Sequence, residues 1–230
     1  MVSQPHSNYI DIIIPVYNEE EILPEFHRRI TALNLPLNLL YIDNCSTDRS
    51  VEIITSFSGA KLLRHDRNEG YGGSILDGFA HSDNEKIIII DADCEYPPEI
   101  LPELINKLDA ADVVYTSRFL EGRNQFMPFT KRLGNQLLTT FFNLLFGQNL
   151  TDLYTGCKGL KRSTLSGITL RRQGFEHVLE LAVKLAKRKI IMQEVAIDFS
   201  PRSTGEAKMK HLSETLKYLY LIVFYSLTER

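Results

Sequence analysis

An apolar strand that ends on crowded carboxylates constrains this chain more than any other feature of its sequence. The stretch is "EKIIIIDADCEYPPE", residues 85–99, in which four isoleucines run directly into Asp91, Asp93 and Glu95. A strand that is apolar on both sides must be covered on both faces, which is typical of parallel sheets. Ligands of such sheets bind at the carboxyl ends of the strands. The stretch therefore predicts a buried central strand with a ligand site at its end.

Apolar strands of the same kind recur along the first half of the chain and alternate with helical segments. Strands are predicted at residues 9–18, 37–44, 60–66, 85–90 and 111–119, and helices at residues 19–33, 46–57, 68–82 and 97–108. Ser46 or Thr47 is the expected N-cap of the second of these helices. The alternation predicts an α/β fold, Rossmann-like, with a mostly parallel central sheet flanked by helices.

Beyond residue 120 the rhythm changes, but no linker or internal repeat divides the chain. A polar loop leads into a Phe- and Leu-rich helix within residues 122–148, and a second helix is predicted at residues 174–189. A strand follows from residue 190, and the chain closes on an apolar helix. A length of 230 residues suits one domain. We therefore expect residues 1–230 to form a single domain.

Charge and hydropathy exclude several classes of protein. The net charge is −3 and the pI is about 6.1, so the protein lacks the overall positive charge that is typical of nucleic-acid-binding proteins. The first residues are polar and lack the apolar core of a signal peptide, and no apolar run approaches the ~20 residues of a membrane-spanning helix. Cys45, Cys94 and Cys157 lie far apart and indicate reduced thiols. We expect a cytoplasmic protein without a nucleic-acid partner.

The acidic turn after the isoleucine run predicts a divalent metal site. Residues two apart on an extended segment point the same way, so Asp91 and Asp93 can face one ligand, with Glu95 as a third candidate. Close carboxylates repel one another, and a divalent cation removes that conflict. Hard oxygen ligands suit Mg²⁺ or Mn²⁺. The alternative, that an acid caps the helix beginning near Pro97, explains one carboxylate better than three.

Motifs in both halves give the chain a resemblance to the family 2 glycosyltransferases, which have the GT-A fold. In the first half these motifs are "PVYNEEE", "IDNCSTDRS", "RNEGYGGSILDGF" and "DADCEYPPE". In the second half, "TSRF", "RLGN", "TDLYTGCKGL", "GFEHVLE" and "EVAIDFSPRSTGEAK" are similar to the polyprenyl-phosphate, or dolichol-phosphate mannose synthase-like, branch. The resemblance implies a single GT-A domain in which residues 9–120 bind a nucleotide sugar, residues 121–210 bind an acceptor and residues 211–230 form a closing apolar helix.

For the donor, the resemblance implies a nucleotide diphosphate sugar, with UDP or GDP left open, bound with Mg²⁺ or Mn²⁺. The residues assigned to the metal are Asp91, Asp93 and Glu95, and those assigned to the nucleotide sugar are Pro15, Tyr17, Glu19, Asp43, Arg118 and Asp152. The glycines of "GYGG", Gly72 among them, are expected to let the backbone approach the sugar diphosphate. Asn44 stands where the family usually has a second aspartate, which links it to recognition of the base.

For the acceptor, the chemistry favours a polyprenyl phosphate such as dolichyl or undecaprenyl phosphate. A sugar hydroxyl needs a general base, whereas a phosphate monoester is already anionic near neutral pH and needs cations. The candidate cations are Lys158, Arg202 and Lys208 at the phosphate, and Arg123, Lys131 and Arg132 beside the Phe-rich helix. By resemblance, Arg202 also takes part in catalysis with Asp91, Asp93 and Glu180. Lys158 stands where the branch commonly has arginine.

Two apolar helices are candidates for a lipid-facing surface. The first presents Leu137, Leu138, Phe141, Phe142, Leu145 and Phe146, and the closing helix presents Leu216, Leu219, Tyr220 and Val223. Helices of this kind with basic flanks can rest in a membrane interface. Peripheral contact with the cytoplasmic face of a membrane is one interpretation, and completion of the core is the other.

Two other functions stay open on the sequence alone. The first is a transferase that adds a sugar to a saccharide or to a lipid-linked oligosaccharide, for which Glu180 or Glu176 has to act as the base. The second is a non-catalytic subunit that binds a nucleotide sugar. The acidic turn and the basic loop near Arg202 speak against the second.

Overall fold

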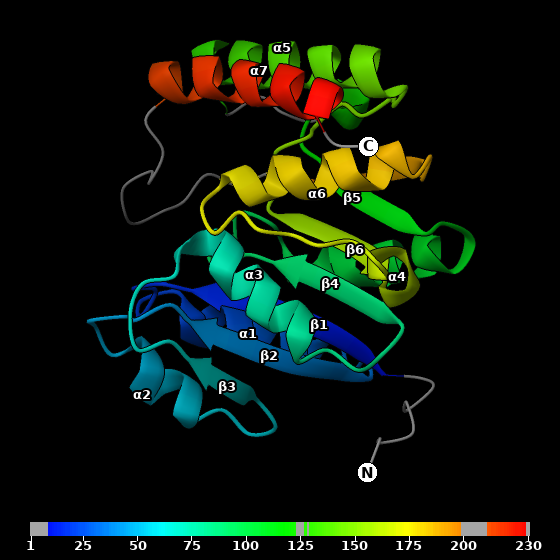
Figure 1. The fold of residues 1–230 in the computed structure, drawn as a ribbon. Coiled ribbons are helices and arrows are strands. Elements are labelled where there is room, and N and C mark those ends of the chain that lie inside the picture. Colours follow the sequence, from blue (N-terminus) through cyan, green and yellow to red (C-terminus); the bar gives the residue numbers. More distant parts are fainter. Residues whose placement is uncertain (1–8, 123–126, 128, 199–210, 229–230) are drawn as a thin grey trace.

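A seven-stranded sheet runs through the described part of the chain, which comprises residues 9–122, 127, 129–198 and 211–228 of the computed structural model (Figure 1). Its strands are β1 (Ile10–Val16), β2 (Leu37–Asp43), β3 (Lys61–Arg64), β4 (Lys86–Ile90), β5 (Val113–Ser117), β6 (Cys157–Lys161) and β7 (Met192–Ala196). The order across the sheet is β3-β2-β1-β4-β6-β5-β7, and every strand except β6 points the same way. The prediction of a mostly parallel sheet is therefore confirmed, with one antiparallel strand between β4 and β5.

Helices cover both faces of the sheet, as its apolar strands require. They are α1 (Leu23–Ala32), α2 (Ser50–Thr55), α3 (Gly70–Ala80), α4 (Leu101–Ala110), α5 (Phe129–Phe146), α6 (Glu176–Lys187) and α7 (His211–Thr228), with 3₁₀ turns at Pro98–Ile100, Leu120–Gly122 and Arg162–Leu165. α1, α2 and α4 lie on one face, α3 and α6 lie on the other, and α5 and α7 pack beyond α6 (Figure 1). No helix in this part of the chain is long and apolar enough to cross a membrane.

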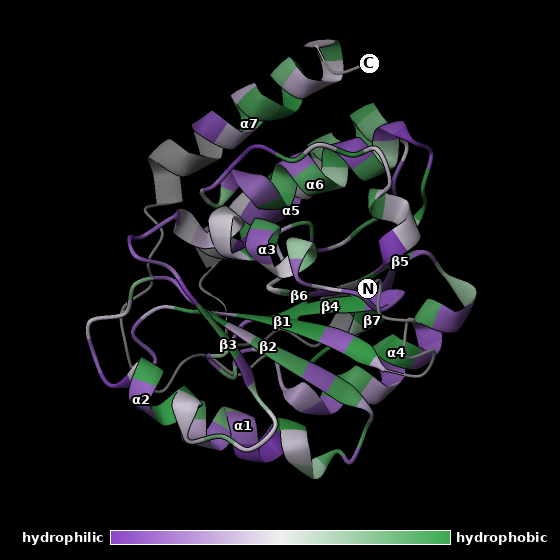
Figure 2. Cartoon of the chain, turned by 60° about the horizontal axis from the view of Figure 1, so that its bottom comes forward, coloured by the Kyte–Doolittle hydropathy of each residue, from purple (hydrophilic) through white to green (hydrophobic). Residues whose placement is uncertain are grey.

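One apolar core lies on each face of the sheet, and together they explain the continuous apolar strands. α1 buries Leu23, Phe26 and Ile30, which recur at helical spacing, in the same core as Ile14 of β1. The neighbouring strand residue Ile13 points the other way, into the core that α3, α5, α6 and α7 complete. Figure 2 shows β1 and β4 as largely hydrophobic strands, in contrast to the mixed colouring of α1. Successive residues of a central strand thus serve opposite cores.

The second helix begins later than the sequence predicted. α2 starts at Ser50, and neither Ser46 nor Thr47 caps it. The Ser46 hydroxyl oxygen instead accepts a hydrogen bond from the Asn18 backbone N–H at 3.0 Å, and the Thr47 backbone N–H donates to Asn18 Oδ1 at 2.8 Å. The polar residues that suggested a cap therefore tie the loop after β2 to the loop after β1.

Candidate functional site

The loops that follow β1, β2, β4 and β5 lie along the carboxyl edge of the sheet and form the candidate site. Each of these four loops contains a non-glycine residue with positive φ: Asn18 (54°), Cys45 (65°), Cys94 (58°) and Glu121 (60°). Such conformations cost about 1–3 kcal/mol each and persist where the surrounding contacts dictate them, often at functional sites. The backbone of this edge therefore favours a functional role, as the sequence predicted for it.

The acidic turn lies at the carboxyl end of β4, and its three carboxylate residues are partly exposed. Asp91 fits closely against Gly156, which precedes β6, because a Cβ at Gly156 would lie 2.1 Å from Asp91 Oδ2. Asp93 Oδ1 accepts a hydrogen bond from the Glu95 backbone N–H at 3.0 Å. A side chain at position 156 would therefore collide with Asp91. The Asp93 carboxylate helps to fix the backbone of the turn.

The chemistry of the turn suits a divalent cation held by two carboxylates. Among the residues that the structure describes, no group of three or more His, Cys, Asp or Glu side chains is placed to hold a metal ion. Glu95 is therefore not gathered with Asp91 and Asp93 into a three-ligand site. Mg²⁺ commonly takes one or two carboxylates and completes its shell with water and substrate phosphates. Asp91 and Asp93 fit such a site, because both bring hard oxygen atoms to an accessible edge.

A buried ion pair joins Arg118, which follows β5, to Asp152, which precedes β6. Arg118 Nε lies 2.7 Å from Asp152 Oδ2, and Arg118 Nη2 lies 2.9 Å from Asp152 Oδ1. Asp152 also accepts a hydrogen bond from Asn135 Nδ2 at 3.0 Å. Burial alone would lower the pKa of Arg118, but the charge of Asp152 outweighs it and raises the pKa. The structure therefore brings these two predicted residues together, and their contact with a sugar stays a prediction.

Lys158 lies behind the acidic turn rather than on an open surface. β6 pairs Lys158 with Ile89 of β4, and its side chain is buried with Nζ 5.0 Å from the centre of the Tyr115 ring. Burial lowers the pKa of Lys158 to about 8, while the charges of Asp91 and Asp152 oppose that shift. The ammonium group therefore lies under the influence of both acids, and its binding of a phosphate stays a prediction.

The residues predicted to hold the base and ribose lie in two loops that are tied together. Asp43 ends β2 in a buried position, and its carboxylate accepts a backbone N–H of the following loop at 3.3 Å. The Glu19 backbone N–H donates to the Ser50 hydroxyl at 2.9 Å. Pro15 within β1 and Tyr17 just after it are partly exposed. The first loop therefore lies beside the end of β2, which is the arrangement that a shared nucleotide site needs.

The glycine-rich start of α3 fits against the segment that leads into α6. A Cβ at Gly70 would lie 2.4 Å from the Gln173 carbonyl oxygen, and one at Gly72 would lie 2.3 Å from that of Arg172. The Gly73 backbone N–H donates to the Gln173 carbonyl at 3.1 Å. The close approach that these glycines permit is thus to the backbone of the chain itself. Contact of Gly72 with a sugar diphosphate stays a prediction.

Glu180 of α6 binds the backbone of the same segment, which leads into α6. Its buried carboxylate accepts hydrogen bonds from the backbone N–H groups of Arg171 (2.9 Å) and Arg172 (2.8 Å) and from Lys184 Nζ (2.8 Å). Burial alone would raise the pKa of Glu180, but these hydrogen bonds outweigh it and lower the pKa. A carboxylate with a lowered pKa is a weak base. The geometry therefore favours a positioning role for Glu180 over the role of general base.

Tyr71 belongs to the site although the sequence did not single it out. Its ring stacks on Phe175, with 5.3 Å between the ring centres, and its hydroxyl is buried. Burial, and then the charge of nearby Asp91, raises the pKa of Tyr71. Its place inside "GYGG" was the only sign in the sequence. Arg202 and Lys208 lie outside the described residues, and their roles stay predictions.

The mostly parallel sheet, which this chain shares with the solved structure of a glucosyl-3-phosphoglycerate synthase, defines the class of fold: the chain has the GT-A fold. Residues 11–169 match the model of "Glycosyl transferase family 2", and the chain belongs to that family. The family suggested by the motifs is thereby confirmed.

Individual relatives agree with the branch and the fold that were expected. Dolichol-phosphate mannosyltransferase of Pyrococcus furiosus is 28% identical over 225 residues, which cover 93% of this chain and 63% of that protein. This chain thus spans less than two thirds of its relative. Glucosyl-3-phosphoglycerate synthase from Mycobacterium tuberculosis with Mn²⁺, UDP and phosphoglyceric acid has a TM-score of 0.75 at 16% identity, over 97% of this chain and 80% of that chain. Its complex with Mn²⁺, UDP-glucose and phosphoglyceric acid has a TM-score of 0.70 at 17% identity, over 95% and 80%.

Proposed function

We propose that the protein is a metal-dependent, inverting glycosyltransferase that moves a sugar from a UDP- or GDP-sugar to a polyprenyl phosphate at a membrane surface. The similarity to a dolichol-phosphate mannosyltransferase supports the acceptor, and the Mn²⁺ and UDP bound to the Mycobacterium tuberculosis synthase support the donor and the metal. Inversion at the sugar carbon rests on the family resemblance. The observation that carries the lipid acceptor is an exposed apolar surface on α5 and α7.

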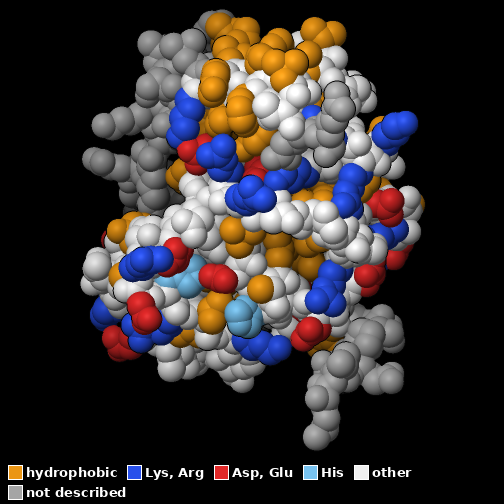
Figure 3. Space-filling view, viewed as in Figure 1, with side chains coloured by type: hydrophobic (Ala, Val, Ile, Leu, Met, Phe, Trp, Pro, Cys, Tyr) orange, Lys and Arg blue, Asp and Glu red, His pale blue; other side chains and the backbone are white. Residues whose placement is uncertain are grey.

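That apolar surface lies at one end of the molecule, over α5 and α7 (Figure 3). Its most exposed side chains are Leu133, Leu137, Leu144 and Leu145 on α5 and Tyr220, Val223, Phe224 and Leu227 on α7. Leu138 and Phe142, which were expected on this surface, lie in the core instead, because the opposite side of α5 packs on the rest of the protein. One side of each helix thus completes the core, and the other is free to meet a polyprenyl chain or a bilayer interface.

At the donor, Asp91 and Asp93 would hold Mg²⁺ or Mn²⁺ against the diphosphate. A cation bound there would neutralise the negative charge that develops as the nucleotide departs. Asp43 and the loop that contains Glu19 would hold the base and ribose, because these tied loops follow β2 and β1, and β1 lies beside β4 in the sheet.

At the acceptor, the chain supplies cations more readily than a base. Lys158 lies near the carboxyl edge, and Arg202 and Lys208 are predicted to join it. Glu180, the acid that would have to activate a sugar hydroxyl, is already held by backbone N–H groups and a lysine. A phosphate acceptor, which is anionic without a base, therefore suits the site better than a saccharide.

A screen of UDP- and GDP-sugars against a polyprenyl phosphate, with the mass of the product as the readout, tests the proposal. We expect a product equal to the lipid phosphate plus one sugar residue when Mn²⁺ or Mg²⁺ is present, and none after chelation. The double variant Asp91→Asn, Asp93→Asn should lower turnover by on the order of 10²-fold or more, because charge on the leaving group is no longer neutralised. Asp109→Asn, on an exposed aspartate, is the matched control and should keep full activity.

The other outcomes of the screen decide between the remaining functions. Sugar transfer to a saccharide alone, abolished in Glu180→Gln, would favour the saccharide transferase. Binding of a nucleotide sugar without turnover on any acceptor would favour a non-catalytic subunit. Full turnover in the double variant of Asp91 and Asp93 would refute the proposed metal site.

A further inference from the structure

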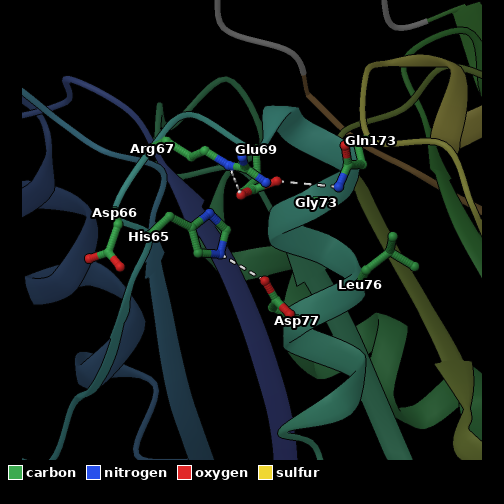
Figure 4. A pocket seen from close by; sticks show the side chains of 8 residues that line it. All are labelled: His65, Asp66, Arg67, Glu69, Gly73, Leu76, Asp77 and Gln173. Carbon is green, nitrogen blue, oxygen red and sulfur yellow. Dashed lines mark hydrogen bonds and ion pairs between the residues drawn. The ribbon is translucent and has the colours of Figure 1, made fainter.

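The loop between β3 and α3 forms one wall of a cavity of about 700 Å³ (Figure 4). The cavity is lined by His65, Asp66, Arg67, Glu69, Gly73, Leu76, Asp77 and Gln173. Most of its polar side chains are paired across the cavity wall: Arg67 with Glu69 at 2.6 Å, Gln173 with Glu69 at 3.3 Å, and His65 with Asp77 at 2.9 Å. Side chains that are already paired with one another are poor ligands for a small molecule. These contacts therefore indicate that the loop is held against α3.

His65 lies at the centre of these contacts. Its side chain is 7% exposed, with Nδ1 3.1 Å from Asn44 Oδ1 and Nε2 2.9 Å from Asp77 Oδ2. Asn44 Oδ1 also accepts the Glu69 backbone N–H at 2.8 Å, which identifies this atom as an acceptor. The imidazole therefore lies between the two side chains and contacts both of them. One side chain thus connects the end of β2 to the middle of α3.

The same contacts fix the surroundings of Asp43. The His65 backbone N–H donates to the Asp43 carbonyl oxygen at 2.9 Å, and Asn44 Nδ2 donates to Asn68 Oδ1 at 3.0 Å. Asn68 Oδ1 in turn accepts the Gly70 backbone N–H at 2.9 Å. Asn44, which the family resemblance linked to the base, therefore uses its amide to hold the β3–α3 loop.

We propose that His65 is a positioning residue for the donor nucleotide, acting through Asn44 and Asp77. His65 holds the end of β2 against α3 and thereby keeps Asp43 in the geometry that binds the base and ribose. The inference rests on the proposed function, since Asp43 is the residue that would contact the donor. Without the imidazole, the end of β2 loses its side-chain connection to α3, and binding of the nucleotide has to restore that order.

Calorimetric titration of UDP and of GDP into the protein, with Mn²⁺ present, tests this role. For the nucleotide that the unmodified protein binds, His65→Ala should raise the Kd by about tenfold, and Asp77→Ala should raise it by a similar factor. The double variant should bind no more weakly than the weaker single variant, because both substitutions break one connection. His65→Asn should recover part of the affinity, since its amide nitrogen can keep the contact of Nδ1. His81→Gln, at the exposed end of α3, is the matched control and should leave the Kd unchanged.

The outcomes separate this inference from the proposed function on which it rests. Unchanged nucleotide affinity in both His65→Ala and Asp77→Ala, while the unmodified protein binds, would overturn the positioning role and leave the transferase intact. Effects of the two substitutions that simply multiply would overturn it as well, because that is the result for two independent structural residues. If His65→Ala does not fold, Asp77→Ala and His65→Asn carry the same test. An unmodified protein that binds neither UDP nor GDP would refute both proposals.

Discussion

Lys158 occupies a buried position that an apolar residue would fill at lower cost in folding free energy. Only 2% of it is exposed, and burial lowers its pKa to about 8. Near neutral pH the lysine is therefore charged inside the core, offset in part by Asp91 and Asp152. Ionisable groups perturbed in this way gather at functional sites. A residue that lowers the stability of the fold without a structural benefit is expected to be retained for activity, and Lys158 fits this description.

Replacing Lys158 with methionine should separate stability from activity. Lys158→Met keeps the length of the side chain and removes the buried charge, so we expect the free energy of unfolding near pH 7 to rise by about 1–3 kcal/mol. Turnover in the polyprenyl phosphate assay should fall. Urea unfolding gives the first quantity, and Lys161→Met, three residues along β6 and more exposed, serves as the control. A Lys158→Met protein that is less stable than the unmodified one would contradict this account.

His177 should make the protein less stable in mild acid. Burial, the largest cause, lowers its pKa to about 4, whereas an unfolded imidazole has a pKa near 6.5. The unfolded state therefore binds the proton first, and the stability that neutral His177 provides is complete above the unfolded pKa and is lost as the pH falls towards 4. Between about pH 7 and about pH 5 the loss should be about 2 kcal/mol. Urea unfolding at both pH values measures it.

The variant His177→Gln should flatten this part of the pH dependence, because no imidazole is left to protonate. Exposed His81 makes the matched control, and His81→Gln should show the same acid sensitivity as the unmodified protein. Equal pH dependence in His177→Gln and the unmodified protein would show that protonation of His177 does not cause the loss of stability in mild acid.

Some site residues can be found from the sequence because they directly follow a strand. Asp43, Asp91 and Arg118 come immediately after apolar runs, and the carboxyl ends of parallel strands share one edge. His65 and Tyr71 could not be found in this way. Their partners lie far along the chain and are brought to them by packing of helices on the sheet, which leaves no local pattern.

At the level of elements, the contact between α3 and the start of α6 joins the two halves of the chain. Gly70 and Gly72 let the backbone at Arg172 and Gln173 approach α3, and Glu180 holds that backbone from the other side. The first and second halves of the sequence therefore pack directly against each other here.

Adding a single methyl group at Gly72 should disrupt this joint. In Gly72→Ala the new Cβ would lie 2.3 Å from the Arg172 carbonyl oxygen, so backbone has to move, and we expect a loss of about 3 kcal/mol in the free energy of unfolding. Gly59→Ala is the comparison, because nothing lies within 4 Å of its Cβ and only its positive φ should cost about 1 kcal/mol. Chemical unfolding measures both losses. Equal losses of unfolding free energy in Gly72→Ala and Gly59→Ala would argue against close packing between α3 and the start of α6.

The elements themselves were largely predictable, and the exceptions have physical causes. Continuous apolar runs identified the strands, since a strand buried on both faces cannot alternate with polar residues. The direction of β6 was not predictable, because an antiparallel strand between two buried neighbours has the same composition as a parallel one. The start of α2 was missed because Ser46 has the chemistry of a cap but bonds to Asn18 of another loop.

On the scale of the whole molecule, the apolar surface of α5 and α7 gives the protein one end that differs from the rest. Exposed leucine, valine and aromatic side chains gather there, whereas charged side chains are spread over the visible face of the sheet and its helices (Figure 3). Large exposed apolar patches mark interaction surfaces. A polyprenyl phosphate resides in a membrane, so this end is where the protein would meet its acceptor.

Two charges on that end should weaken attachment to a membrane. Leu144→Glu with Leu227→Glu places a carboxylate on each helix, and we expect binding to vesicles of phosphatidylcholine and phosphatidylglycerol to fall by about tenfold or more, since two exposed apolar side chains no longer enter the interface. Sedimentation with vesicles measures it. Ile191→Glu is the matched control, because Ile191 is equally apolar and exposed but lies ahead of β7. Similar losses in both proteins would place the contact elsewhere.

The position of β6 between β4 and β5 also bears on how the protein is made. While the ribosome is still adding residues before Cys157, β4 has an open edge, and β5 lacks the neighbour that connects it to β4. Unpaired edges are where nascent chains aggregate, so the first half depends on rapid arrival of the second or on a chaperone. Gly156, against which Asp91 fits, arrives with β6. In a nascent chain, the acidic turn therefore has its final packing only after the segment that contains Gly156 has emerged.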